Sequence, residues 1–135
     1  MKSYDLIIIG SGPGGYIAAL YASRFKKSVC VIEKADLGGT CLNAGCIPTK
    51  ALYESALMYE MARHAATFGV LFEKETLVEF SIAAKRKDEI VATLRKGVEF
   101  LINKSKATLY AGESRGYRSP RRISSTSPPP RARSR

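Results

Sequence analysis

The first 34 residues contain two apolar segments with a segment of small and apolar residues between them. Residues 4–10 (Tyr-Asp-Leu-Ile-Ile-Ile-Gly) are rich in β-branched side chains and end at glycine, which predicts a central parallel strand buried on both faces. Residues 16–22 are small or apolar and free of helix breakers, and cations follow them, which predicts a helix. Residues 28–34 predict a second buried strand. This order and length indicate one βαβ unit with a parallel sheet.

Two further amphipathic segments predict a pair of long helices. The first helix is predicted from Lys50 to Phe68, with Gly69 placed to end it. The second is predicted from Ser81 to about Asn103, with an apolar stripe of Ile82, Ile90, Leu94, Val98 and Leu101. We expect the two helices to pack antiparallel, with their aromatic side chains in the core or between them. Residues 107–111 are then expected to return to the sheet as another strand.

A glycine-rich loop separates the first predicted strand from the first predicted helix. Its sequence, Gly10-Ser11-Gly12-Pro13-Gly14-Gly15, fits the pattern G-x-G-x-x-G. In this pattern the glycines permit a tight turn, a close approach to a pyrophosphate and close packing of the helix on the strand. The helix N-terminus would then direct free N–H groups at the anion. Glu33 ends the second strand 18 residues after Gly15, where a carboxylate can accept hydrogen bonds from ribose hydroxyls. A tight turn without a ligand is the alternative.

Charge is distributed unevenly along the chain. The net charge of +10 over 135 residues suggests an anionic partner. However, residues 114–135 contain seven Arg, six Ser and four Pro without Lys or acidic residues, so the rest carries only +3. We therefore expect a partial, Rossmann-like α/β dinucleotide-binding domain over residues 1–113 and a disordered basic tail over residues 114–135. We expect no nucleic-acid partner, because the arginines of the tail are interleaved with a single aromatic residue, Tyr117, and with no glycine repeat.

The start of the chain bears on its location. Only three residues precede the first predicted strand, which leaves no space for a secretory signal. The apolar run near the start is much shorter than the roughly 18 residues that a membrane-spanning helix needs. We therefore expect a cytoplasmic protein without a membrane partner.

Two cysteines lie close together in residues 38–50, whose sequence is Gly-Gly-Thr-Cys-Leu-Asn-Ala-Gly-Cys-Ile-Pro-Thr-Lys. In a regular helix, five residues rise about 7.5 Å, beyond the roughly 7 Å limit between the Cα atoms of a disulfide. Cys41 and Cys46 could therefore bond only in a distorted segment, which Asn43 and Gly45 would permit. Their spacing is poor for zinc and no second Cys/His pair completes a site, so we expect no metal. A catalytic or redox-sensing dithiol is favoured over two buried thiols that pack as small apolar groups.

These motifs together resemble the N-terminal FAD-binding part of the pyridine nucleotide-disulfide oxidoreductases, most closely the dihydrolipoamide dehydrogenase subfamily. The residues that carry the resemblance are Gly-Ser-Gly-Pro-Gly-Gly, Val-Ile-Glu and the cysteine segment ending in Cys-Ile-Pro-Thr-Lys. Glutathione reductases tend to have a lysine where this chain has Thr49. The likeness covers residues 1–113 and implies an incomplete FAD-binding domain.

The resemblance also implies roles for individual residues. Cys41 would exchange with the dithiol or disulfide substrate, and Cys46 would lie against the flavin in a charge-transfer contact, the two forming a redox disulfide. Lys50 would stabilise the reduced flavin, the alternative being an ordinary lysine in the first turn of a helix. Cys30 is expected in the core and His64 in solvent, without a catalytic role. The residues expected to bind FAD are Gly10, Ser11, Gly12, Pro13, Gly14, Gly15, Glu33, Lys34, Gly39, Thr40, Cys41 and Lys50.

For the intact parent, the resemblance implies oxidation of dihydrolipoamide by NAD⁺ through Cys41, Cys46 and FAD. It also implies a homodimer that serves lipoamide-bearing 2-oxo acid dehydrogenase complexes. The chain lacks the NAD-binding and dimerisation domains, so we expect it to be catalytically incomplete by itself. The change from Lys to Arg after Glu113 suggests a tail that is out of frame or replaces the proper continuation. The alternatives are a member resembling glutathione or mercuric reductase, a non-enzymatic FAD-binding module and an interaction protein using its basic tail.

Overall fold

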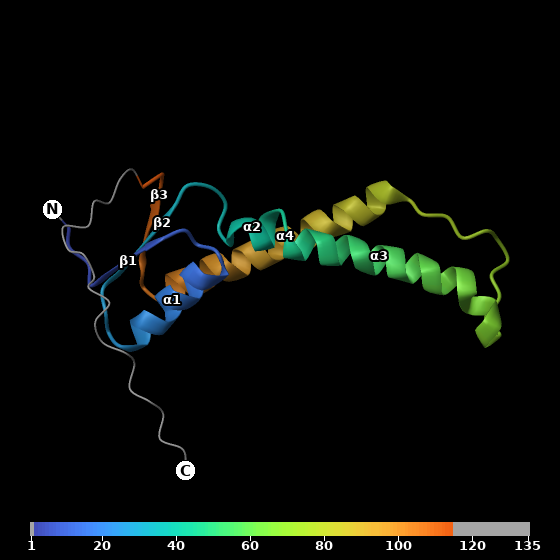
Figure 1. Ribbon diagram of the computed structural model, residues 1–135, viewed down its shortest axis with the longest axis horizontal. Coiled ribbons are helices and arrows are strands. Elements are labelled where there is room, and N and C mark those ends of the chain that lie inside the picture. Colours follow the sequence, from blue (N-terminus) through green and yellow to red (C-terminus); the bar gives the residue numbers. More distant parts are fainter. Residues whose placement is uncertain (1, 115–135) are drawn as a thin grey trace, which may run out of the picture.

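The computed structural model describes residues 2–114, in which a small parallel sheet lies at one end and a long helical pair extends away from it (Figure 1). One helix, α1, packs against the sheet, and the short α2 lies where the helical pair begins. The elements are β1 (Leu6–Ile9), α1 (Pro13–Arg24), β2 (Val29–Glu33), α2 (Gly39–Asn43), α3 (Cys46–His64), the 3₁₀ helix η1 (Ala65–Phe68), α4 (Phe80–Lys104) and β3 (Thr108–Ala111).

The sheet has the strand order β1-β2-β3, and both pairings are parallel, as predicted. β2 is the central strand, and its residues Val29 and Val31 are buried against α1. The prediction that the first strand is central and buried on both faces is wrong for the described residues. β1 pairs only with β2 there, and Ile7 and Ile9 are 56% and 63% exposed. They alternate with Ile8, which points towards α1, so nothing in residues 2–114 covers their face.

Two apolar clusters hold the elements together. One lies between α1 and the sheet, and the other joins α4 to α1 and α2. The predicted stripe on α4 is partly wrong, because Ile82 and Leu94 are exposed. Around Leu94 the buried face is displaced around the helix, because α4 packs there against α1 and α2. The buried residues of α4 are Val91, Val98 and Ile102.

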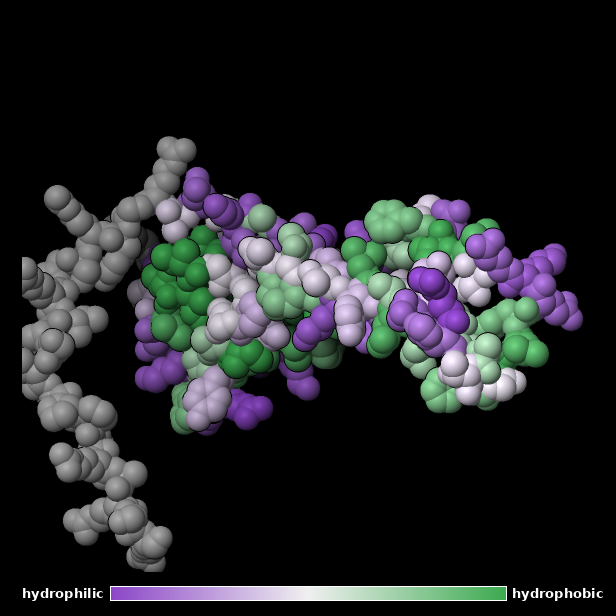
Figure 2. All heavy atoms as spheres, turned by 45° about the vertical axis from the view of Figure 1, so that its right-hand side comes forward, coloured by the Kyte–Doolittle hydropathy of each residue, from purple (hydrophilic) through white to green (hydrophobic). Residues whose placement is uncertain are grey.

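The helices α3 and α4 lie side by side, as predicted (Figure 1). The prediction that their aromatic residues are packed is wrong for Tyr53, Phe80 and Phe100, which are 62%, 66% and 64% exposed. Two helices share only one seam, so side chains that point away from it have no partner among the described residues. Figure 2 shows apolar side chains on the surface at both ends of the molecule.

Several helix boundaries differ from the prediction. α1 begins at Pro13 rather than near Tyr16, because proline suits the first turn of a helix. α3 begins at Cys46, four residues before Lys50, and α2 was not predicted. Gly69 adopts φ +77° after η1, where the sequence places the end of the helix.

Residues 115–135 lie outside the described part of the chain, so the predicted disorder of the basic tail falls there. The division at residue 113 therefore stays a prediction. Within residues 2–114, no helix combines the length and apolar character needed to cross a membrane.

Candidate functional site

The glycine-rich loop makes a tight turn from β1 into α1. A Cβ atom on Gly15 would lie 2.0 Å from the carbonyl oxygen of Gly10, so no side chain fits there. Gly39, at φ +64°, touches the same loop, since a Cβ atom on it would lie 2.8 Å from the Cα atom of Gly12. The structure thus brings the cysteine segment against the glycine-rich loop, with backbone on backbone.

A buried serine joins this loop to the end of β2. The backbone N–H and the hydroxyl of Ser11 both donate to Oε2 of Glu33, each at 2.7 Å, and Ala35 N–H donates to Oε1 at 3.0 Å. Gly38 N–H in turn donates to the carbonyl oxygen and Oγ of Ser11, both at 3.2 Å. Ser11 is fully buried, so three separate backbone segments meet at one side chain.

These hydrogen bonds determine the charge state of Glu33. Burial by itself would raise the pKa of this carboxyl, but the donors on Ser11, Ala35 and Lys34 outweigh burial and hold the pKa of Glu33 below its ordinary value. The carboxylate is therefore ionised at neutral pH and can accept further hydrogen bonds.

Glu33 and Lys34 line a cavity of about 220 Å³ at the carboxyl ends of all three strands. Ligands of open parallel α/β sheets bind outside the carboxyl ends of the strands. Gly10 also lines this cavity, and so does Gly112, which follows β3. Sequence analysis did not select Gly112, although a glycine directly after a third predicted strand was the available signal.

Cys41 and Cys46 form a disulfide with their Cα atoms 4.7 Å apart. The helical path breaks between them, because Ala44 has φ −141° and Gly45 has φ −125° and ψ −107°. The predicted distortion is confirmed at Gly45, whereas Asn43 stays within α2. The alternative of two free buried thiols does not apply to this pair.

The two sulfur atoms have different surroundings. Cys41 is partly buried and lines a crevice of about 460 Å³ between α1, α2 and α4. Cys46 is exposed, and Lys50 is also exposed one turn later on the same face of α3. The crevice is otherwise lined by Pro13, Tyr16, Gly38, Leu42, Ile47, Leu94, Gly97, Val98, Phe100 and Leu101.

Sequence analysis missed the residues that hold the cysteine segment. Nδ2 of Asn43 donates to the carbonyl oxygens of Leu37 and Gly39 at 2.9 and 3.0 Å, while its Oδ1 accepts from Arg95 Nε at 3.0 Å. Arg95 also pairs with Asp36 at 3.1 Å. Arg95 lies 52 residues from Asn43 in the sequence, so no local pattern could have identified this contact.

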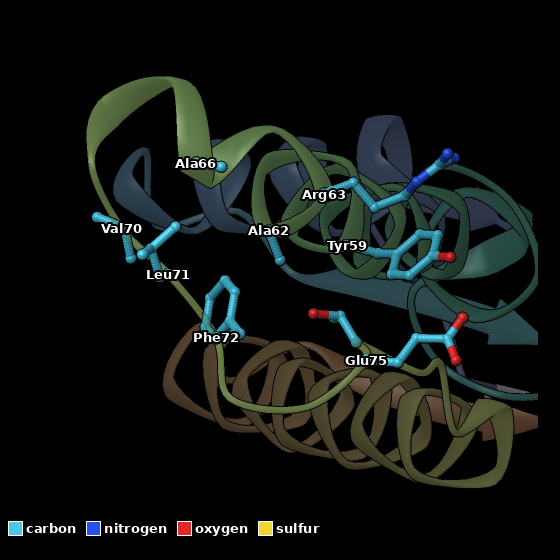
Figure 3. A pocket seen from close by; sticks show the side chains of 9 residues that line it. Tyr59, Ala62, Arg63, Ala66, Val70, Leu71, Phe72 and Glu75 are labelled. Atoms are coloured by element: carbon cyan, nitrogen blue, oxygen red, sulfur yellow. The ribbon is translucent and has the colours of Figure 1, made fainter.

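The remaining candidates lie apart from this site. Cys30 is buried in β2, as predicted, and burial raises the pKa of its thiol. His64 is exposed, as predicted, and hydrogen-bonds Glu60 at 2.9 Å. Figure 3 shows another cavity, of about 310 Å³, at the far end of the helical pair, where Tyr59 and Phe72 are among the lining side chains. No residue predicted for the site lines this cavity.

Comparison with known proteins places this arrangement in a family. Residues 4–122 match the pyridine nucleotide-disulphide oxidoreductase family. The chain belongs to this family. The match confirms the resemblance found in the motifs, and the parallel sheet with its helices is the Rossmann-like fold expected for an FAD-binding fragment. The family match extends to residue 122, which lies inside the segment that its composition distinguishes as a tail.

Three similar proteins share one name. The chain is 47% identical over 111 residues to the dihydrolipoyl dehydrogenase of Chlorobaculum parvum, covering 82% of this chain and 24% of that protein. It is 43% identical over 114 residues to that of Rhizobium etli, with 84% and 24% covered. It is 41% identical over 111 residues to that of Acholeplasma laidlawii, with 82% and 33% covered. The chain thus spans about a quarter to a third of the length of these relatives, and membership of the family implies a flavin cofactor.

Proposed function

We propose that this chain is the FAD-binding, disulfide-bearing part of a dihydrolipoamide dehydrogenase. The observation that carries the proposal is the position of the Cys41–Cys46 disulfide. It lies next to the glycine-rich loop, whose Gly15 has no room for a side chain, and Cys41 alone of the pair lines an apolar crevice. The shared name of the relatives supports the same activity.

The described residues fit a flavin dinucleotide. The backbone of residues 11–14, at the start of α1, would hold the pyrophosphate, because free N–H groups at a helix N-terminus attract anions. Glu33 would bind the ribose, and Gly39, Thr40 and Cys41 would contact the rest of the cofactor. Lys50 would place a cation on the exposed side of Cys46, near the flavin ring. When bound, FAD would supply the chemistry that carries two electrons from the dithiol to NAD⁺.

The chain's own chemistry is thiol–disulfide exchange. A thiolate of dihydrolipoamide attacks Sγ of Cys41, so that a bond forms between these sulfurs, the Cys41–Cys46 bond breaks and Cys46 leaves as a thiolate. The second substrate thiolate then attacks the first substrate sulfur, closes the lipoamide disulfide and releases Cys41 as a thiolate. Two electrons pass from the substrate to the cysteine pair, and the two substrate protons are available to the new thiolates.

The crevice beside Cys41 supports a short apolar dithiol as substrate. None of the described side chains lining it is charged. Glutathione is a charged tripeptide and would need charged partners to offset the cost of leaving water. The crevice therefore favours lipoamide over the alternative of a member resembling glutathione reductase, and the disulfide favours an enzyme over a binding module.

We extend the proposal to the parent protein as its family implies. It would be a cytoplasmic homodimer that reoxidises the lipoamide of 2-oxo acid dehydrogenase complexes, with NAD⁺ bound by residues outside this chain. The support is the shared name of the relatives and the family match.

Thiol labelling of the full chain tests the proposed function. Before reduction, Cys41 and Cys46 should not react. Dihydrolipoamide should release two thiols per chain, about tenfold faster than dithiothreitol at equal concentration, because the apolar crevice takes up the apolar dithiol. The variant Leu94→Gln, in the crevice wall, should reduce this advantage without slowing dithiothreitol. Equal rates for the two dithiols in the wild type would contradict the substrate assignment, and a pair that dihydrolipoamide does not reduce would contradict the function.

A further inference from the structure

A hydrogen-bond network from α4 holds the segment that carries Cys41. Asn43, the last residue of α2, lies between the two cysteines and directs its amide back at the carbonyl oxygens of Leu37 and Gly39. These bonds close residues 37–43 into a compact loop. The remaining amide oxygen accepts from Arg95 at 3.0 Å.

Arg95 connects this loop to the buried side of α4. It lies on α4 between the core residues Val91 and Val98, which are 7% and 5% exposed. Its guanidinium contacts Asn43 through Nε and Asp36 through Nη1, at 3.0 and 3.1 Å. A planar guanidinium can hold two acceptors in one fixed geometry, whereas an ammonium group acts as a single point charge.

α2 needs such support because it is short. A helix of five residues has too few internal hydrogen bonds to offset the cost of nucleating it. While the disulfide is formed, it also ties α2 to the first residue of α3. Once the disulfide is reduced, that covalent tie is lost, and the position of Cys41 relative to Cys46 depends on noncovalent contacts.

We propose that Asn43 and Arg95 are positioning residues that keep Cys41 in bonding range of Cys46 when the pair is reduced. The inference rests on the proposed function, because the proposed thiol–disulfide exchange passes through a state in which the cysteine pair is reduced. The network raises the effective concentration of one thiol next to the other and so favours closure of the disulfide. Without it, the reduced segment gains conformational freedom, and reforming the disulfide must order that segment again.

The test is the equilibrium of the full chain with mixtures of reduced and oxidised dithiothreitol. Each exchange oxidises one dithiothreitol to its cyclic disulfide and reduces one Cys41–Cys46 pair to two thiols. We expect Arg95→Ala and Asn43→Ala each to shift this equilibrium at least tenfold towards the reduced pair, which corresponds to about 30 mV. The double variant should shift it little further, because both substitutions break one network. Arg95→Lys should shift it less than Arg95→Ala.

Arg86→Ala is the matched control. Arg86 also lies on α4 and donates to a backbone carbonyl of α3, that of Ala51, at 3.0 Å, so this hydrogen bond lies outside residues 36–43. It should lower stability while leaving the redox equilibrium within twofold of the wild type. Asp36→Asn removes only the outer ion pair, so it provides a folded variant, with about a threefold shift, if the alanine variants do not fold.

A folded Arg95→Ala or Asn43→Ala chain with a wild-type equilibrium would overturn the inference, as would an equal shift in Arg86→Ala. If instead dihydrolipoamide fails to reduce the wild type, the proposed function fails. The dithiothreitol comparison still reports on the network in that case, so the two failures are distinguishable.

Discussion

The two ends of the molecule differ in how closely their residues are packed. At the sheet end, Ser11 is fully buried and Gly39 touches Gly12, so the glycine-rich loop and the cysteine segment are in close contact where they meet. At the far end of the helical pair, Leu71 and Leu77 are each 80% exposed. Figure 2 shows apolar side chains on the surface there. The chemistry proposed for this chain lies entirely at the sheet end.

The difference shows two ways in which residues determine structure. The sheet end depends on close backbone contacts and on buried hydrogen bonds. A single added atom, such as a Cβ on Gly15, disturbs these contacts. The far end depends on one amphipathic seam between α3 and α4, which tolerates many side chains on its outer faces. Substitutions at the two ends should therefore have very different effects.

Gly15→Ala should have the largest effect. The new Cβ atom would lie 2.0 Å from a backbone oxygen of the same tight turn, which cannot move without opening the loop. We expect a loss of at least about 4 kcal/mol in the free energy of unfolding, measured by urea denaturation. Gly14→Ala is the control, because its Cβ atom meets nothing within 4 Å. A Gly15→Ala chain as stable as the control would show that the loop is not tightly constrained.

Ile102→Ala compares the core with the far end directly. Ile102 is fully buried in the cluster that joins α4 to α2, so truncation leaves a cavity. The free energy of unfolding should fall by about 3 to 4 kcal/mol. Leu77→Ala, at 80% exposure, should change it by less than about 0.5 kcal/mol. Equal losses from the two substitutions in the same denaturation experiment would remove the distinction between the two ends.

Ser11→Ala should have a smaller effect that depends on pH. The substitution removes a buried hydrogen bond to the Glu33 carboxylate, which costs about 2 kcal/mol at neutral pH. The folded state lowers the pKa of Glu33, so this stabilisation is full above the pKa of the unfolded chain. It is lost as the pH falls through the lower pKa of the folded state.

Denaturation of wild type and Ser11→Ala between pH 7 and pH 3 measures this difference. Ser23→Ala is the control, because Ser23 donates to the carbonyl oxygen of Leu20, which does not titrate. The cost of Ser23→Ala should stay constant over the same range. A cost of Ser11→Ala that does not change with pH would show that its hydroxyl does not stabilise the ionised form of Glu33.

Gly97→Ala should have the smallest effect and the opposite sign. Gly97 lies inside α4, and a Cβ atom there meets nothing within 4 Å. Alanine should raise the free energy of unfolding by about 0.5 to 1 kcal/mol, because glycine is the poorer helix former. Ala92→Gly, at an exposed position of the same helix, should lower it by a similar amount. If Gly97→Ala instead lowered the free energy of unfolding, the space around Gly97 would be smaller than the structure shows.

Most of the fold could be predicted from the sequence because its signals are local. The two apolar strands, the glycine-rich loop and the helical periodicity of residues 81–103 each depend on neighbouring residues, and the structure has these elements within a few residues of the expected bounds. Whether β1 and Tyr53 are buried or exposed could not be predicted in this way. Burial depends on what covers a face, and the period of a strand or helix carries no information on that.

For the candidate site, the sequence by itself determined the type of chemistry: a glycine motif, an acid at the end of a strand and a close cysteine pair. Only the tertiary structure decided that Cys41 rather than Cys46 lines the crevice, and that Arg95 holds Asn43. The physical reason is distance along the chain. A motif of adjacent residues is constrained by its own backbone, whereas contacts between residues 52 positions apart exist only after helices and sheet have packed together.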